Sequence, residues 1–243
     1  MRFQATPGQT SYGEDIGILL LDSRAPFIQG DVGNAKSYAY PVRFKRVEGL
    51  TVERIFAHDR TFLEAMIDGA RELEREGVRA ITGDCGFMAL YQQEVKEAVR
   101  IPVFLSSLIQ IPFIKATLPR SARVGIITAN ADALTDALFA KLGITLDDSL
   151  VIAGLQDKPC FFEAAIAESG GLDSDAIRQE ILEATREMLT KHPGVQSMLL
   201  ECSMLPPYAA TVQEAAKLPV YDFLSMINHV RSALVKERFP DAL

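Results

Sequence analysis

The stretch RAITGDCGFMALYQQEV, residues 79–95, carries the pattern that decides the fold. It begins with a short apolar run that predicts a buried strand, turns at Gly83 and Asp84, and continues as an amphipathic helix. Cys85 stands at this turn, after the strand and before the helix. A strand that leads directly into a helix is the first half of a βαβ unit, which builds a parallel sheet.

The same alternation of short apolar runs and amphipathic stretches extends along most of the chain and predicts an α/β fold. The predicted strands are residues 16–21, 52–57, 79–82, 103–105, 124–128, 150–153, 197–200 and 220–221. The clearest predicted helices are residues 61–76, residues 131–142 with Asn130 as the cap, and a helix that begins at Asp173 and Ser174.

Proline-marked breaks at residues 111–112 and 206–207 divide the chain. We expect two pseudo-symmetric Rossmann-like, doubly wound lobes with parallel sheets and an active site between them. Residues 1–112 together with residues 208–243 are predicted to form the first lobe, and residues 113–207 the second.

A second turn, in SMLLECSMLPPYAATVQEA at residues 197–215, repeats the first in outline. An apolar strand again runs into a cysteine, Cys202, and a helix follows. In open α/β sheets ligands bind at the carboxyl edge, where helix N-termini favour anions such as a thiolate or a substrate carboxylate. The two thiols are therefore expected to reach one site from two lobes.

Buried cysteines also occur as inert small apolar side chains, and this alternative applies to both turns. The matched setting of the two cysteines favours a chemical role for the pair. Cys160 opens an apolar helix in KPCFFEAA, and we expect it to be structural.

The composition narrows the class of protein. The chain has 243 residues, of which 48% are hydrophobic and 23% charged, as in an ordinary globular protein. A net charge of −7 without a basic stripe argues against a nucleic-acid partner. The sequence contains neither a membrane-spanning apolar run nor a signal peptide, and its three cysteines are an odd number. We expect a cytoplasmic protein with reduced thiols and no membrane partner.

The sequence lacks the common motifs for nucleotide and metal binding. The P-loop, the Rossmann G-x-G-x-x-G after the first strand, H-E-x-x-H and C-x-x-C are all missing from the sequence. No cofactor and no metal are therefore expected.

These residues resemble the aspartate/glutamate/hydantoin racemase superfamily, in particular its hydantoin-racemase-like members. The shared features are Asp22 and Ser23 after the first strand, one cysteine turn in each half, the Thr-Ala-Asn loop at residues 128–130 and the GDVGN loop at residues 30–34. The resemblance implies a cofactor-independent racemase or epimerase, and we expect it to form a homo-oligomer. One thiolate would remove the α-proton of a small carboxylate, amino-acid derivative or hydantoin, and the opposite thiol would return a proton.

The resemblance also implies the site residues. Cys85 and Cys202 would be catalytic, and Asp22 would support Cys85, with Asp84 either tuning that thiol or capping the helix. The substrate-binding positions would be Ser23, Gly86, Phe87, Thr128, Asn130, Ser203 and Met204.

The chain departs from the amino-acid racemases of this superfamily after both cysteines. Those enzymes often have Asn-Thr after the first cysteine and Thr-His after the second, where this chain has Gly86-Phe87 and Ser203-Met204. A basic partner for Cys202 and polar contacts to an α-amino group are therefore missing. Phe87, Met88 and Met204 either form an apolar wall, which suits a hydantoin or a substituted carboxylic acid, or face the core.

Other functions stay open on the same residues. They are an arylmalonate-type decarboxylase, a maleate-type cis-trans isomerase and a non-catalytic protein that binds small carboxylates. A cysteine hydrolase is the weakest candidate, because no histidine stands beside either thiol in the sequence.

Overall fold

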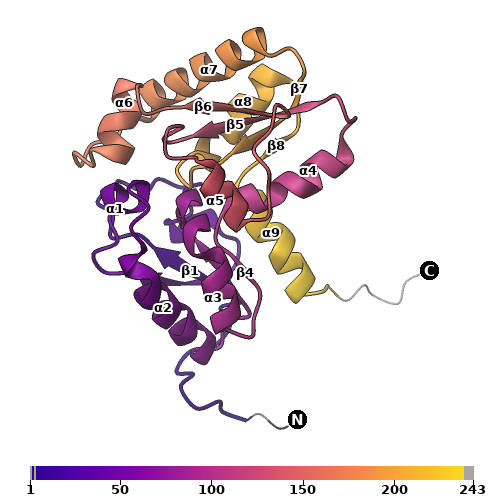
Figure 1. Ribbon diagram of the computed structural model, residues 1–243. Helices are drawn as coiled ribbons and strands as arrows, with labels where there is room; N and C mark the ends of the chain where they lie inside the picture. Colours follow the sequence, from indigo (N-terminus) through magenta and orange to yellow (C-terminus); the bar gives the residue numbers. More distant parts are fainter. Residues whose placement is uncertain (1, 3, 238–243) are drawn as a thin grey trace.

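The computed structural model describes residue 2 and residues 4–237, and Figure 1 shows them as two α/β lobes, one above the other. Each lobe contains one four-stranded sheet whose strands are all parallel. The predicted class, two α/β lobes with parallel sheets, is confirmed.

The two sheets repeat one strand order. The first runs β2-β1-β3-β4, with β1 at Ile16–Leu20, β2 at Val42–Arg46, β3 at Ala80–Gly83 and β4 at Val103–Phe104. The second runs β6-β5-β7-β8, with β5 at Arg123–Thr128, β6 at Leu150–Gly154, β7 at Val195–Leu200 and β8 at Val220–Tyr221. The order reverses between β1 and β3 and between β5 and β7, which is where doubly wound sheets bind ligands.

Helices surround both sheets (Figure 1). The α-helices are α1 at Val52–Phe56, α2 at Leu63–Arg75, α3 at Gln92–Ala98, α4 at Ile111–Thr117, α5 at Asp136–Lys141, α6 at Pro159–Phe161, α7 at Ser174–Lys191, α8 at Ala209–Ala216 and α9 at Phe223–Leu234. Short 3₁₀ turns are η1 at Ala35–Ser37, η2 at Arg60–Phe62, η3 at Gly86–Tyr91, η4 at Ser107–Gln110 and η6 at Pro206–Tyr208, and η5 at Phe162–Ile166 is a π-helix.

One strand prediction is wrong. Residues 52–56 of this segment form helix α1, which Thr51 caps by accepting a hydrogen bond from the Arg54 N–H group. The strand that pairs with β1 is β2, whose VRFKR sequence alternates charged and apolar residues as a half-buried edge strand does.

A second difference concerns the helix after β5. Thr135 caps α5, which therefore starts five residues later than the predicted 131–142 helix. Asn130 caps only a local turn, where its side chain accepts a hydrogen bond from the Asp132 N–H group.

The C-terminal segment does not return to the first lobe as one unit. Strand β8 pairs with β7 in the second sheet, so residues 208–221 continue the second lobe rather than the predicted first. Helix α9 then packs on the first sheet, where Phe223 and Ile227 join Ile16 and Phe104 in one buried cluster. The chain thus crosses back only after β8.

The two lobes pack against each other through buried apolar side chains. Leu105 and Leu108 of the first lobe belong to the same buried cluster as Ile126 and Leu199 of the second. Such a continuous core fixes the two sheet edges relative to each other.

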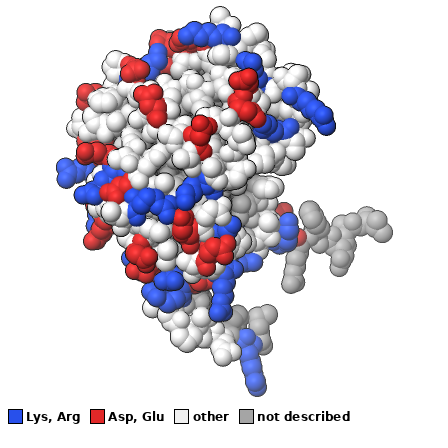
Figure 2. Space-filling view, in the orientation of Figure 1, with Lys and Arg blue, Asp and Glu red and all other residues white. Residues whose placement is uncertain are grey.

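The distribution of surface charge and the length of the helices are relevant to nucleic-acid and membrane partners. Figure 2 shows acidic and basic side chains interspersed over the face in view. Within residues 2 and 4–237, no helix combines the length and the apolar character needed to cross a membrane. The cytoplasmic location and the homo-oligomer stay predictions.

Replacing Phe223 with alanine should destabilise the chain strongly, because its ring is 0% exposed and anchors α9 on the first sheet. We expect a loss of about 3–5 kcal/mol in the free energy of unfolding, measured by urea denaturation. The half-buried neighbour Leu224 is the matched control, and Leu224→Ala should cost clearly less. Equal losses in the two variants would contradict the anchoring role of Phe223.

Candidate active site

A cavity of about 40 Å³ lies between the lobes at the carboxyl edges of both sheets. It exceeds the roughly 10–15 Å³ that a single water requires. The first lobe contributes Leu21, Ser23, Phe27, Val52, Phe56, Asp84, Cys85, Gly86 and Phe87, and the second contributes Ala129, Ala165, Glu201, Cys202, Ser203 and Met204. The lining includes two thiols and two carboxyl groups.

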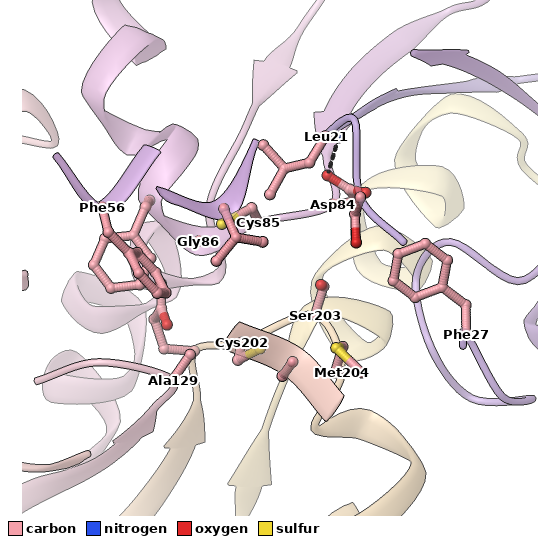
Figure 3. A pocket seen from close by; sticks show the side chains of 15 residues that line it. Leu21, Phe27, Phe56, Asp84, Cys85, Gly86, Ala129, Cys202, Ser203 and Met204 are labelled. Atoms are coloured by element: carbon pink, nitrogen blue, oxygen red, sulfur yellow. Dashed lines mark hydrogen bonds between the residues drawn. The ribbon is translucent and has the colours of Figure 1, made fainter. Parts of the chain in front are cut away.

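The two thiols face the cavity from opposite walls (Figure 3). Cys85 follows β3 and immediately precedes η3, while Cys202 follows β7 in the turn that precedes η6. Each thiol accepts a hydrogen bond from the backbone N–H group two residues later, that of Phe87 or that of Met204. The two lobes therefore present their thiols in the same local geometry.

Both thiols are held in the neutral form. Burial raises the pKa of Cys85 and of Cys202 well above the ordinary value, and the Glu201 carboxylate is the next largest cause for both. Repulsion from Cys202 also raises the pKa of Cys85, so the thiols are close enough to interact. A thiolate formed here is a strong base.

Asp84 directly precedes Cys85 and is only 4% exposed. Its Oδ1 accepts a hydrogen bond from the Leu21 N–H group at 2.9 Å (Figure 3). Burial raises the pKa of Asp84 to about 7, with a further increase from Glu168 and a partial offset from the Leu21 bond. Near neutral pH this carboxyl group is therefore present in both protonation states.

Glu201 occupies the corresponding position before Cys202 and is 0% exposed. Its Oε2 accepts a hydrogen bond from the Thr128 hydroxyl at 2.8 Å. Burial raises the pKa of Glu201 to about 7, and the Thr128 bond lowers it only in part. Both cavity cysteines, Cys85 and Cys202, thus directly follow a buried acidic residue.

Residue 86 must be glycine because the side chain of Glu201 lies directly against its backbone. A Cβ atom at residue 86 would lie 1.8 Å from Oε1 of Glu201 and 2.8 Å from its backbone oxygen. The side chain of the second lobe therefore packs directly on the backbone of the first, beside both cysteine turns.

Two loops of the first lobe also touch the second. In the GDVGN loop, the Val32 N–H group donates to the Ser203 carbonyl oxygen at 3.3 Å. Ser23 donates to the Glu168 carboxylate, and the Arg24 N–H group donates to the same oxygen at 3.0 Å. These contacts hold the loops after β1 over the cavity.

The structure brings most of the predicted site residues together. Those lining the cavity are Ser23, Asp84, Cys85, Gly86, Phe87, Cys202, Ser203 and Met204. Thr128 lies behind it and orients Glu201.

Asp22, Asn130 and Cys160 do not line the cavity. The Asp22 carboxylate accepts hydrogen bonds from the Gly49 N–H group at 2.9 Å and from Arg46 at 3.5 Å, so its contacts differ from the predicted support of Cys85. Asn130 caps its local turn instead of facing a ligand. Cys160 lies in α6, where its N–H group donates to Glu180.

Several lining residues were not foreseen. Glu201 had a detectable signal, because a charged residue ends an otherwise apolar strand immediately before a cysteine, as Asp84 does. Phe27 and Phe56 come from loops and from α1, and no local pattern in the sequence points to them. Among the described residues, no group of three or more His, Cys, Asp and Glu side chains is arranged to hold a metal ion.

Comparison with known proteins identifies relatives along most of the chain. The chain is 31% identical over 230 residues to dimethylsulfoniopropionate lyase 6 of Emiliania huxleyi, covering 90% of this chain and 60% of the relative. It is 32% identical over 214 residues to the dimethylsulfoniopropionate lyase of Durusdinium sp. clade D, covering 85% of this chain and 70% of the relative. The chain thus spans less than two thirds of the Emiliania protein. No family model matches the chain.

Solved structures show the same fold at low sequence identity. Allantoin racemase from Klebsiella pneumoniae superposes with a TM-score of 0.61 and 14% identity, covering 94% of this chain and 95% of that one. An arylmalonate decarboxylase mutant gives a TM-score of 0.59 at 18% identity, covering 93% and 96%. The predicted resemblance to the aspartate/glutamate racemase superfamily is confirmed at the level of the fold.

The predicted activity, racemisation by two thiols, is corrected by the curated relatives. They are named as lyases, and an isomerase assignment is wrong for a chain with this relationship. The relatives support the prediction that the chain is an enzyme with the racemase-superfamily fold. They do not support the predicted hydantoin-type racemase. Racemisation and elimination both begin by removing an acidic proton, so the same thiols suggested the wrong outcome.

The match to the Durusdinium protein, at 32% identity, extends over 85% of this chain and 70% of that relative. The two α/β lobes with parallel sheets match the fold of the racemase-superfamily structures. The chain is therefore a member of the same family as these dimethylsulfoniopropionate lyases, with the fold of the aspartate/glutamate racemase superfamily.

Proposed function

We propose that the chain is a lyase that eliminates dimethyl sulfide from dimethylsulfoniopropionate. The observation that carries this proposal is the lining of the cavity. Two thiols and two buried carboxyl groups line it, and none of its described lining residues is Lys, Arg or His. Such a site suits a substrate that brings a positive charge and an acidic C–H bond. The family relationship supports the same substrate.

In the proposed reaction, one thiolate takes the proton from the carbon next to the substrate carboxylate. The electron pair of that C–H bond forms a carbon–carbon double bond, and the bond from the β-carbon to sulfur breaks. Dimethyl sulfide leaves as a neutral molecule with the electron pair of the broken bond. Acrylate remains, and the thiol holds the proton until a base in solution or in the site removes it.

One base is enough for this reaction, because a neutral sulfide needs no proton from an acid as it leaves. A two-base inversion would need both thiols, whereas here the opposite thiol stays protonated. The sulfonium charge of the substrate offsets the carboxylates that raise the thiol pKa values. We infer that substrate binding itself favours formation of the thiolate.

The substrate carboxylate is proposed to bind near Asp84 and Ser203. The hydroxyl of Ser203 and the carboxyl of Asp84 project toward the space between the walls (Figure 3). Because the pKa of Asp84 is raised to about 7, this group is readily protonated and then donates a hydrogen bond to the substrate. Ser203 supplies a second donor.

Replacing the thiols should separate the proposed base from structural cysteines. Loss of a general base lowers turnover by about 10²–10⁴-fold, and we expect this in Cys85→Ala, in Cys202→Ala or in both. Acrylate is measured by liquid chromatography and dimethyl sulfide by gas chromatography. Cys160→Ala is the control, because Cys160 lies outside the cavity, and it should keep wild-type turnover. Wild-type activity in both single cavity variants would refute the proposal.

The proposed base should also give the reaction a characteristic pH profile. Burial and Glu201 raise the thiol pKa values above the ordinary value, so the thiolate fraction increases as the pH rises. We therefore expect kcat at saturating substrate to increase from pH 6 to pH 9, whereas loss of the Asp84 proton near pH 7 should raise KM over the same range. Circular dichroism at each pH verifies that the chain stays folded. A profile that falls over this range is incompatible with a thiolate base.

A further inference from the structure

Glu201 is a buried acid with half of its hydrogen-bonding capacity unused. Its Oε2 is bound by the Thr128 hydroxyl at 2.8 Å. Its Oε1 is buried and has no hydrogen-bond partner within the described part of the chain. An ionised carboxylate taken out of water is costly unless a donor or an opposite charge satisfies it. Oε1 is therefore available to a ligand that brings a hydrogen-bond donor or a positive charge.

The contacts of Glu201 place Oε1 at the junction of the two cysteine turns. A Cβ atom at Gly86 would lie 1.8 Å from Oε1, so this oxygen packs on the backbone that follows Cys85. Glu201 itself directly precedes Cys202 in the sequence. Its charge acts on both thiols, since it is the second largest cause of the raised pKa in each.

Aromatic rings stand beside this junction. Phe87 follows Gly86 and packs edge-to-face on Phe56, with ring centroids 4.8 Å apart and an interplanar angle of 71°. Both rings line the cavity that Glu201 also lines. Figure 3 places Phe56 and Ala129 at one end of the cavity and Asp84, Ser203 and Phe27 at the other, with the thiols between them.

Aromatic faces attract compact cations, and a carboxylate supplies the opposite charge. We propose that Oε1 of Glu201, with the rings of Phe56 and Phe87, binds the onium group of the substrate. This subsite selects small acids that carry a sulfonium or quaternary ammonium group on the β-carbon. The inference deepens the proposed lyase function and rests on it for the natural ligand, but binding can be tested without turnover.

The chemistry of elimination predicts how this subsite affects the kinetics. The onium charge is present in the bound substrate and disappears as the neutral sulfide leaves. The attraction to Glu201 is therefore strongest before the reaction and weaker in the transition state. Loss of the charge should raise KM while leaving kcat unchanged or higher. A residue with only a structural role would not separate KM from kcat in this way.

Two ligands of the same shape isolate the charge. 3-(Trimethylammonio)propionate and 4,4-dimethylpentanoate differ only in a positively charged nitrogen in place of a carbon. Their dissociation constants are measured by titration calorimetry at pH 8, above the raised pKa of Glu201, with acrylate assayed to verify that no turnover occurs. The wild type should bind the cationic ligand about tenfold more tightly than its neutral isostere.

Glu201→Gln should remove this preference by weakening the cationic ligand alone, and Phe56→Leu should reduce it. Glu214→Gln makes the same chemical change on the exposed face of α8 and should keep the full preference. Equal affinities for the two ligands in the wild type, or an unchanged preference in Glu201→Gln, would overturn the subsite.

If Glu201→Gln fails to fold, the pH dependence of the preference supplies the test. Glu201 and Asp84 both gain a proton below pH 7, so the preference should shrink between pH 8 and pH 5.5 in the wild type and also in Asp84→Asn, where only Glu201 of the two still titrates. A preference that is constant over this range would refute the role of Glu201. Failure of the proposed function looks different: the cationic ligand would be preferred, but dimethylsulfoniopropionate would give no acrylate.

Discussion

Four ionisable side chains line the cavity between the two lobes. Asp84, Cys85, Glu201 and Cys202 all line it, and burial is the largest cause of a raised pKa in every one of them. No basic side chain lines the cavity among the described residues to balance the negative charge. Near pH 7 the carboxyl groups of Asp84 and Glu201 are partly ionised, so the site gains from any ligand that supplies a positive charge.

The repeated architecture explains how these groups meet. Each lobe uses the strand order that reverses beside its first strand, and each places an acid and a cysteine after the third strand in chain order. The backbone N–H group two residues after each cysteine binds its sulfur. What distinguishes the walls is the environment of the acid. A backbone amide binds Asp84, whereas a hydroxyl binds one oxygen of Glu201 and leaves the other unpaired.

Much of this arrangement could be predicted from the sequence. The turns at Cys85 and Cys202 are local patterns, a strand followed at once by a helix, and such patterns are readable without an alignment. The strand β2 was missed because its charged residues resemble a loop, and α1 was misread because VERIF is as apolar as a short strand. Phe27 and Phe56 reach the cavity only through tertiary packing, which no spacing encodes.

The reaction was harder to predict than the site. A pair of thiols at opposite walls fits a two-base inversion and an elimination equally well, since both begin at the same proton. The residue that we propose favours elimination is Glu201, which stood in the quoted stretch but had no assigned role. The sequence cannot show that Oε1 of Glu201 lacks a hydrogen-bond partner, because this depends on tertiary contacts in the folded chain.

The packing of Glu201 on Gly86 also ties two positions together over the course of evolution. A side chain at residue 86 would occupy the space of Oε1, and so a chain with Asn or Thr after its first cysteine cannot keep this carboxylate in place. A small residue at position 201 would remove the contact with the side chain only, because a Cβ atom at residue 86 would still lie 2.8 Å from the backbone oxygen of residue 201. Relatives with glutamate at position 201 should therefore keep glycine at position 86, and this pair of residues is the one on which the proposed onium subsite depends.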